Sequence, residues 1–398
     1  MKVSLECTNA SFHIDIAEII ENINGHSKFE LVRQIQKRQE QIITQLCGPK
    51  HSRSYSFKRA GSYTKELVTA IGTVNFKVQK VKSRADNTIN SPILEYMDLK
   101  RRKYSKDLRM KLAEYASKMS YQDASIEFET ATGIHVPKRT IHRFVQEIAP
   151  KLLKANNPEN EPEGKTESLM GDSTEVRALA SREMNMVHVL ISPDSGQLLH
   201  LEVNKDWPNC KTETLISDKE PALTNAIATD NCQLCILHAI KYLLFTLWGE
   251  GMSKDDREKV KRSIKEALFT LAISTKKHLQ DRDAAMLQDR IDKTLKVLDE
   301  MAKSLEGEGY VRAAEFLKKN SRFVVTFAQL ALQGAKIPYT TNRIERLMGE
   351  VSKRCKHNWM HWSTRGLKDI LTIVLVRYTT KPLYDNFKNA YIHNATIH

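Results

Sequence analysis

Two periodicities of apolar residues follow one another in the first part of the chain. Residues 27–48 read SKFELVRQIQKRQEQIITQLCG, where apolar positions recur near one face of a helix and a glycine comes after the last of them. This pattern predicts a helical N-terminal region over residues 1–50, with helix from residue 1 to about 47. The next segment, KELVTAIGTVNFKVQKVKSR, alternates apolar and polar residues on either side of Gly72. Alternation interrupted by a glycine predicts a β-hairpin.

Two helices separated by a short turn are expected after the hairpin. The first lies in SYQDASIEFETATG and ends at Gly133, and the second lies in VPKRTIHRFVQEIAPKLL and begins near Pro137. Helix, short turn and helix in this order is the helix-turn-helix pattern. We therefore expect residues 51–153 to form a DNA-binding region. An ordinary helical hairpin with a basic surface is the alternative.

The pattern changes after a polar segment at residues 154–167, which contains two prolines and is predicted to be a linker. Beyond it the chain is expected to form strand, hairpin, strand, helix and strand, with Asp194-Ser195-Gly196 as the hairpin turn. From Ala239 onward the long amphipathic segments predict helices. Residues 168–398 are thus predicted to be an α/β domain with an all-helical insertion at about 239–338.

Composition points to a polyanionic partner. The 398 residues carry a formal net charge of +14, which favours DNA or RNA binding. No apolar run is long enough to span a bilayer, and charged residues interrupt the N-terminal segment that would otherwise resemble a signal peptide. These features predict no membrane association and a cytoplasmic protein, nucleoid-associated if the host is prokaryotic. Six scattered cysteines do not suggest a disulfide framework.

Basic residues gather where a helix-turn-helix protein would contact DNA. The start of a recognition helix meets base edges and phosphates, and a basic run precedes the two helices. The candidate DNA-contacting residues are Lys138, Arg139, Thr140, His142 and Arg143 in the second helix, and Arg101, Arg102 and Lys103 in the basic run.

Three carboxylates stand at positions that suit a metal centre. Asp172 lies within the strand-like SLMGDSTEV, Asp218 follows the apolar TLIS, and Glu345 opens a helix after TTNRI. A charge in a strand is costly unless it is exposed, paired or bound to a cation. Each residue also has a local interpretation: a strand-edge aspartate, a turn residue, and the glutamate of a capping box begun by Asn342. Together they form a set of oxygen ligands of the kind that Mg²⁺ prefers.

These motifs, in this order, resemble the DDE transposases of the Mutator-like type and their prokaryotic insertion-sequence relatives. The similarity rests on GDSTEV, on SDKEPAL followed by CILH, and on TTNRIERLMGEVSKR. It implies a ribonuclease H-like sheet with the first aspartate on its first strand and the second after its fourth. It further implies a Cys-x-x-His after the second aspartate and a helical insertion before an Asn-x-x-Glu. The matching residues are Asp172, Asp218, Cys235, His238, Asn342 and Glu345.

The resemblance implies an enzyme that cleaves the ends of a mobile element and joins them to target DNA. Its three carboxylates would hold two Mg²⁺ or Mn²⁺ ions, with Cys235, His238 and Asn342 supporting the core. Terminal inverted repeats and target DNA would be the partners, and a homo-oligomer is expected because two DNA ends must be brought together. Basic residues of the last helix would follow the phosphate backbone, a solvated helix face being the alternative: Arg343, Arg346, Lys353 and Arg354.

The connection before the second aspartate departs from this pattern. The third strand is expected to end near Val203 and the fourth to begin near Thr214, which leaves the ten residues NKDWPNCKTE between them. A parallel crossover usually needs a dozen or more residues and commonly includes a helix. A catalytically inactive, transposase-derived DNA-binding protein is therefore the alternative function. A nuclease or resolvase of the same fold without strand transfer is a third.

Two further motifs have a structural and a functional interpretation. Cys232, Cys235 and His238 resemble part of a zinc site with Cys210 as the fourth ligand, yet a second pair of ligands at the usual spacing is missing and the neighbours are apolar. In HNWMHWS, Trp359 and Trp362 could stack on flipped bases or pack in the core or on the surface.

Overall fold

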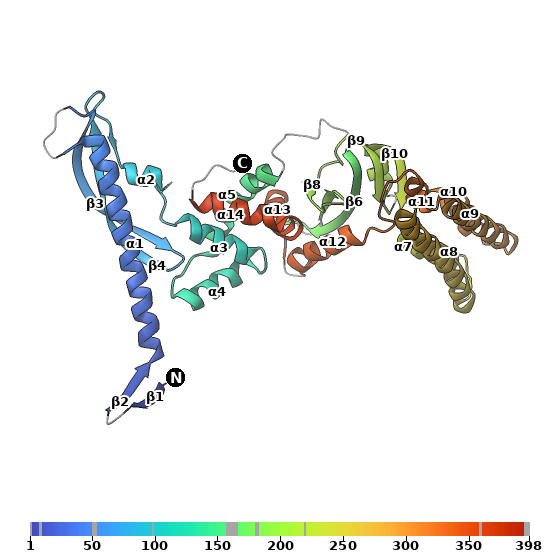
Figure 1. Ribbon diagram of the computed structural model, residues 1–398, viewed down its shortest axis with the longest axis horizontal. Helices are drawn as coiled ribbons and strands as arrows, with labels where there is room; N and C mark the ends of the chain where they lie inside the picture. Colours follow the sequence, from blue (N-terminus) through green and yellow to red (C-terminus); the bar gives the residue numbers. More distant parts are fainter. Residues whose placement is uncertain are drawn as a thin grey trace. The chain divides into compact units, whose positions relative to one another are not determined.

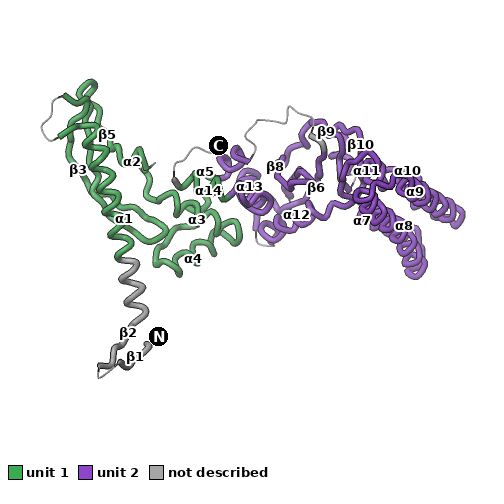
Figure 2. The backbone as a smooth tube through the Cα atoms, in the orientation of Figure 1, with its two compact units in different colours: residues 1–148, 385–398 green, residues 149–384 purple. Residues whose placement is uncertain are grey.

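The computed structural model divides the chain into two compact units (Figure 2). The first unit comprises residues 1–148 and 385–398, and the second comprises residues 149–384. This division differs from the expected domains, because the last residues of the chain belong with the first unit. Residues 2–25, 166–167 and 393 are described by backbone alone. The described residues are 2–7, 10–49, 54–97, 99–156, 166–179, 183–218, 220–357 and 360–393.

The first unit begins with a β-hairpin followed by a long helix. Strands β1 (Lys2–Cys7) and β2 (Ala10–Asp15) pair antiparallel, and α1 (Ile16–Cys47) follows directly (Figure 1). The expectation of helix from residue 1 is wrong for these strands, whose sequences KVSLEC and ASFHID alternate apolar and polar residues. The helix expected to end before Gly48 is confirmed.

A three-stranded sheet packs against α1. Strands β3 (Phe57–Thr69) and β4 (Gly72–Ser83) form the expected hairpin, and β5 (Ile89–Asn90) extends it ahead of α2 (Pro92–Tyr96). The buried face of β4 supplies Val74, Phe76 and Val78 to a core shared with α1. Gln39 joins the two elements by hydrogen bonds, since its side-chain amide donates to Lys77 O at 2.9 Å and its Oε1 accepts from Gln79 N at 2.8 Å.

The expected helix–turn–helix follows α3 (Lys106–Ala116). It consists of α4 (Tyr121–Thr132) and α5 (Lys138–Asn156). Ser120 caps α4 by accepting from Asp123 N, and Gly133 ends it with φ of 68°. The turn is held to α4 because Ser125 Oγ donates to Val136 O at 2.6 Å.

The second unit is built on a five-stranded mixed sheet whose strands lie in the order β10-β9-β6-β7-β8. Strands β6, β7 and β8 pair antiparallel in sequence, and β9 and β10 run parallel to β6. The hairpin expected at Asp194-Ser195-Gly196 joins β7 to β8. The strand bounds are β6 Thr166–Arg177, β7 Met184–Ile191, β8 Leu198–Val203, β9 Cys210–Ser217 and β10 Ile227–Leu234.

The connection from β8 to β9 is even shorter than the sequence suggested, because β9 already begins at Cys210. Residues 204–209 cross from the edge of the sheet without a helix. One face is nevertheless covered, since Trp207 is only 6% exposed and packs with Leu190, Leu215 and Leu223. The short helix α6 (Pro221–Ala226) brings Leu223 to this cluster. A single indole thus fills part of the space that a crossover helix would otherwise occupy.

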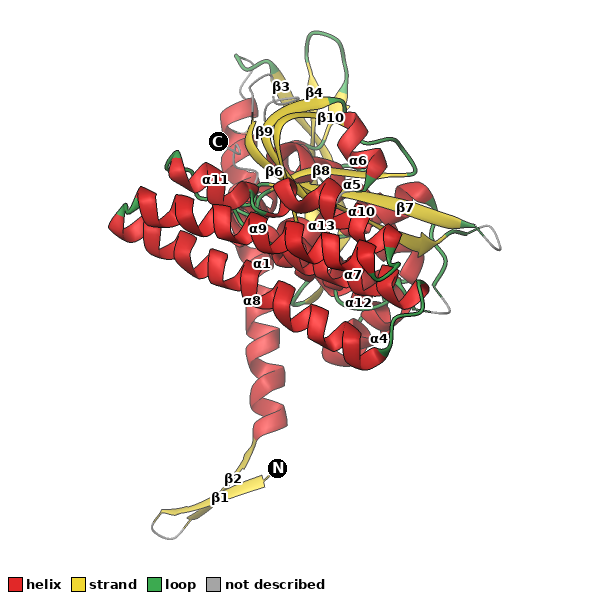
Figure 3. Cartoon of the chain, turned by 90° about the vertical axis from the view of Figure 1, so that its right-hand side faces the viewer, coloured by secondary structure: helices red, strands yellow, loops and turns green. Residues whose placement is uncertain are grey.

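The helical insertion leaves the sheet after β10 and returns beside its starting point. Its helices are α7 (Ile236–Gly249), α8 (Lys254–Asp281), α9 (Ala284–Gly307), α10 (Val311–Val324) and α11 (Thr326–Leu332). They share a hydrophobic core of their own, and α8 and α9 run side by side (Figure 3). The two ends of the insertion meet where Ile236 N donates to Tyr339 O at 3.1 Å.

Three helices follow the insertion among the described residues, which end at 393. They are α12 (Asn342–Cys355), which packs on β6, α13 (Thr364–Thr379), which packs on β8, and α14 (Lys381–His393). Within the described part of the chain, no helix combines the length and apolar character needed to cross a bilayer.

Candidate metal centre

Asp172 and Asp218 lie on neighbouring parallel strands at the same level of the sheet. Met170 of β6 pairs with Ile216 of β9, so the register continued by two residues brings Asp172 opposite Asp218. Side chains two residues apart in a strand share a face. Gly171, between Met170 and Asp172 on β6, is on the opposite face of the sheet. An added Cβ there would come within 2.8 Å of Leu223 Cδ2. The absence of a side chain at this position therefore lets α6 pack closely behind the two aspartates.

The carboxyl group of Asp172 is electrostatically strained. Burial, and then the neighbouring carboxylate of Asp218, raise its pKa from 3.8 to about 6. Glu345 acts in the same direction more weakly, while the hydrogen bond from Ser173 N (2.8 Å) and the charge of His238 oppose the shift. A cation bound between these carboxylates would offset the shift, because it would replace like-charge repulsion by attraction.

Glu345 comes from the first turn of α12 and is oriented by Thr341. The expected capping box headed by Asn342 does not form, since Asn342 is already the first helical residue and Thr341 occupies the N-cap position. The hydroxyl of Thr341 donates to Glu345 Oε1 at 2.6 Å. Glu345 remains exposed. It is therefore held on one side and accessible on the other, which suits a metal ligand better than a cap.

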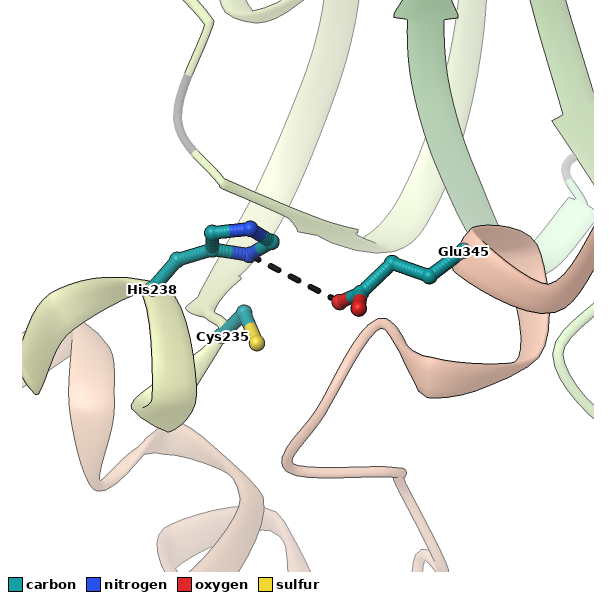
Figure 4. A group of neighbouring side chains, drawn as sticks. All are labelled: Cys235, His238 and Glu345. Carbon is teal, nitrogen blue, oxygen red and sulfur yellow. Dashed lines mark ion pairs between the residues drawn. The ribbon is translucent and has the colours of Figure 1, made fainter. Parts of the chain in front are cut away.

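Cys235 and His238 lie at the start of α7, close to the carboxylate of Glu345 (Figure 4). Cys235 N donates to Ser217 O at 2.9 Å, which fixes the start of α7 next to the strand end that carries Asp218. His238 Nδ1 lies 3.8 Å from Glu345 Oε1 and 3.3 Å from Thr341 Oγ1. The order of elements thus brings residues from three distant parts of the sequence to one edge of the sheet.

The protonation of Cys235 and of His238 depends on the contact between the two side chains. Burial by itself raises the pKa of the Cys235 thiol, but hydrogen bonds from His238 and Thr341 outweigh it, and the pKa is lowered overall. The hydrogen bond to Cys235 raises the pKa of His238 despite partial burial, and the charges of Cys235, Glu345 and Asp218 add to this effect.

The predicted recognition helix offers part of the expected surface in the first unit. Lys138, Arg139 and Arg143 are exposed at the start of α5. His142 is half-buried with its ring 5.3 Å from that of Tyr121. Thr140 is buried, so its side chain supports the turn of the helix and has little surface for DNA.

The basic run before α3 is largely paired with acidic side chains. Arg102 donates to Glu147 Oε1 at 2.7 Å, as does the buried Arg109. Lys103 forms an ion pair with Glu66 at 2.8 Å. Arg101 is exposed, with φ of 61°. Contact with DNA through Arg102 or Lys103 would therefore compete with existing ion pairs.

The four basic residues expected to follow the phosphate backbone differ in their surroundings. Arg343 donates to the carbonyls of Pro193, Asp194 and Ser195, each at 2.7 Å, and so holds the β7–β8 turn. Arg346 is exposed on α12. Lys353 is exposed and pairs with Glu350 at 2.7 Å.

Arg354 requires a correction. Its side chain is 4% exposed, and its guanidinium lies 5.0 Å from the ring centroid of Trp362. This burial leaves it no surface on which to follow a phosphate backbone. Trp362 is itself buried, with its indole N–H donating to Cys355 O at 3.2 Å, so it packs in the core and is not available for stacking on a base. Trp359 lies outside the described residues.

Sequence reasoning missed Thr341 and Trp207, and it misjudged Arg354. Arg354 follows Val351 by three residues on the buried stripe of α12, so helical spacing could have revealed its position. Thr341 directly precedes the Asn-x-x-Glu motif, and no feature of the sequence around it indicated that it contacts Glu345. Neither Cys232 nor Cys210 belongs to the group of potential metal ligands found among the described residues, which consists of Cys235, His238 and Glu345.

Comparison with known proteins adds no further assignment. No protein-family model matches the sequence, and no curated protein matches it.

Proposed function

We propose that this protein is a DNA transposase that cleaves and joins strands at a metal centre formed by Asp172, Asp218 and Glu345. The observation that carries the proposal is the convergence of Asp172 and Asp218 on adjacent parallel strands, with the pKa of Asp172 raised by burial and by its neighbour. Burial and then the neighbouring carboxylate both oppose the charged form of Asp172, and a purely structural role gives no reason for a carboxyl group at this position. Perturbed acidic residues of this kind are typical of functional sites.

The fold supports the same proposal. The first carboxylate stands on the first strand of the sheet and the second directly after the fourth, as the ribonuclease H-like core of the resembling family requires. Glu345 follows a helical insertion, again in the expected order. The covered sheet face at Trp207 weakens the main reason for the inactive alternative, because the short crossover does not leave that face bare.

The three carboxylates fit two Mg²⁺ or Mn²⁺ ions, because hard divalent cations prefer carboxylate oxygens. Bound there, such ions supply activation of the attacking oxygen and stabilisation of the leaving oxygen in phosphodiester chemistry. Asp172 and Asp218 would hold the ions against the rigid sheet, and Glu345 would close the site from α12. Thr341 orients Glu345, and His238 offsets part of the negative charge beside it.

DNA recognition is proposed for the exposed start of α5 in the first unit. Lys138, Arg139 and Arg143 offer three positive charges on an exposed helix start. Charge of this kind favours DNA by neutralising phosphates and releasing counterions. The substrates would be the terminal repeats of a mobile element and a target duplex, with two copies of the chain joining two ends.

Cleavage of labelled duplexes carrying the flanking ends of the element tests the proposal. Full-length protein with Mn²⁺ or Mg²⁺ is expected to nick at the element end, and Asp218→Ala should reduce the rate at least a hundredfold. Glu213→Ala, an exposed change on the same strand, is the matched control and should retain activity. Tight, salt-sensitive binding with no cleavage by any variant would instead favour the inactive DNA-binding protein.

A further inference from the structure

The group formed by Cys235, His238 and Glu345 has a chemistry different from that of the carboxylate pair. It combines a thiol, an imidazole and one carboxylate, whereas Asp172 and Asp218 offer oxygen alone. We propose that Cys235, His238 and Glu345 form a second metal site that takes Zn²⁺ in preference to Mg²⁺. Because both sites use Glu345, zinc would remove that residue from the carboxylate centre and block it.

The geometry of the three side chains is close to that of a zinc site. Their potential ligand atoms all lie within 4.8 Å of one another, and His238 Nδ1 is 3.8 Å from Glu345 Oε1. Zinc bonds of about 2.0–2.3 Å place tetrahedral ligand atoms roughly 3.3–3.8 Å apart. A contraction of at most about 1.5 Å would therefore complete three corners, and water would occupy the fourth.

The side chains are held so that only a small adjustment is needed. Cys235 is buried and receives a hydrogen bond from Thr341 N, with the N–Sγ distance at 3.4 Å. His238 stands one turn further along the same helix, and its Nδ1 already faces Glu345 (Figure 4). Glu345 has the most room to adjust of the three, because its side chain is 41% exposed and contacts Thr341 and His238 from one side.

Electrostatics favours the form of the site that binds metal. Cys235 occupies the N-cap of the 14-residue helix α7, and its sulfur accepts the hydrogen bond from Thr341 N. A helix N-terminus stabilises negative charge. The thiolate is the form that ligates a metal.

Ligand type separates the two metals. Sulfur and imidazole suit Zn²⁺ and Co²⁺, whereas Mg²⁺ takes oxygen ligands and keeps its waters. Magnesium should therefore prefer Asp172 and Asp218 together with Glu345, and zinc should prefer Glu345 together with Cys235 and His238. The blocking effect rests on the proposed function, but the binding of zinc does not.

Cobalt provides a probe that reports sulfur ligation directly. Titration of full-length protein with Co²⁺ is expected to give a thiolate-to-cobalt charge-transfer band, which Zn²⁺ then abolishes by displacement. Cys235→Ser should remove the band, and His238→Ala and Glu345→Gln should each weaken Co²⁺ affinity at least tenfold, since loss of even an outer-shell partner typically costs about 10–100-fold. Cys232→Ser changes a cysteine of β10, three residues before Cys235 and outside the group; it is the matched control and should keep the band.

Several results would overturn the site. They are a band that survives Cys235→Ser, a band lost equally in Cys232→Ser, or an unchanged Co²⁺ affinity in Glu345→Gln. His238→Ala guards against misfolding of the buried cysteine variant, because His238 is half-buried and its removal leaves the thiol in place.

The link to the carboxylate centre is tested separately. Asp172→Asn should keep the cobalt band while losing the increase in melting temperature caused by Mg²⁺. In the unaltered protein, Zn²⁺ should suppress Mg²⁺-dependent DNA cleavage, and Cys235→Ser should relieve that suppression at least tenfold. Failure to cleave DNA with the band present would count against the proposed function alone, and cleavage without any band would count against the zinc site alone.

Discussion

At the scale of single residues, Asp172 carries a charge that its surroundings in the fold disfavour. Its carboxylate is half-buried, close to Asp218, and has a pKa of about 6. Because the pKa is raised above the ordinary value of 3.8, the folded state binds this proton more tightly than the unfolded state. In the metal-free protein, the contribution of this proton to the free energy of unfolding is thus fully present below about pH 4. It is lost as the pH rises through about 6.

Asp172→Asn should consequently stabilise the metal-free protein at pH 8. Each tenfold change in proton affinity corresponds to about 1.4 kcal/mol, so the gain should reach up to about 3 kcal/mol at pH 8 and vanish near pH 4. Urea unfolding at the two pH values measures it. Glu175→Gln, an exposed change on the same strand, should leave the free energy of unfolding nearly unaltered at both. A destabilised Asp172→Asn protein at pH 8 would contradict the electrostatic account.

The residue scale also marks where sequence reasoning ends. Asp172, Asp218 and Glu345 could be singled out because a charge at a strand, a strand end or a helix start is unusual enough to need a reason. The choice between Asn342 and Thr341 as the N-cap could not be made, because both residue types cap helices and one residue of register decides between them. Arg354 was misjudged because its charge suggested solvent, although the ring of Trp362 compensates its burial.

At the scale of elements, the connection from β8 to β9 depends on one side chain. Trp207 lies against the sheet in a cluster with Leu190 and Leu215, and its ring centroid is 4.3 Å from that of His188. The polar sequence NKDWPN gave no sign of this role, because a lone tryptophan in a short loop has no periodicity. A periodic pattern of many residues predicts a helix or a strand. The role of a single tryptophan depends on the surface against which it packs, and the sequence does not show that surface.

Trp207→Ala should destabilise the protein by about 3–5 kcal/mol, the usual cost of truncating a buried large aromatic residue. Trp207→Phe should cost much less, since most of the apolar contact remains. Thermal or urea unfolding of the full chain measures both. Asp206→Ala, an exposed change one residue earlier, should stay within about 0.5 kcal/mol of the unaltered protein. Similar decreases in the free energy of unfolding for Asp206→Ala and Trp207→Ala would contradict the packing role of the Trp207 side chain.

The β7–β8 turn depends on Arg343 of α12. Gly196 has φ of 75°, and a Cβ there would lie 2.2 Å from the guanidinium, so the glycine gives the arginine room to reach three carbonyls. The turn itself was predictable from Asp-Ser-Gly. Its partner was not, because Arg343 lies about 150 residues away in the sequence.

Arg343→Ala should lower the free energy of unfolding by about 1–3 kcal/mol in the absence of DNA, because it removes charge-assisted hydrogen bonds to the turn. Arg346→Ala removes an equal charge from an exposed position on the same helix and should change stability little. Unfolding curves without nucleic acid separate this effect from any loss of DNA contact. Equal stability of the two variants would mean that Arg343 does not hold the turn.

At the scale of the whole molecule, the proposed DNA-binding residues and the proposed metal centre belong to different units. The exposed basic start of α5 belongs to the first unit, and the carboxylates belong to the second. The net charge of +14 suggested a polyanionic partner but could not say which surface meets it. In the first unit, burial and ion pairing narrow the expected DNA-contacting residues to Arg101, Lys138, Arg139 and Arg143.

The double variant Lys138→Glu, Arg139→Glu should weaken DNA binding at least tenfold and reduce the dependence of log affinity on log salt by about two. It should keep the Mg²⁺-induced rise in melting temperature. Fluorescence anisotropy over a salt series and thermal unfolding measure the two properties. Lys276→Glu, Lys277→Glu on α8 makes the same charge change at exposed positions and serves as control. An equal loss in both double variants would indicate a general charge effect without a defined surface.

The helical insertion leaves and re-enters the sheet at neighbouring residues, Ile236 and Tyr339, and has its own core. Its outer turn, at the exposed Arg282 and Asp283 between α8 and α9, lies in a region where a chain break is well tolerated. A gene divided there would encode one fragment with Asp172 and Asp218 and another with Glu345. Neither fragment would possess the complete set of carboxylates, and the pairing of α8 with α9 would reunite them. A break at this turn would therefore make the proposed metal centre depend on the association of two separately expressed fragments.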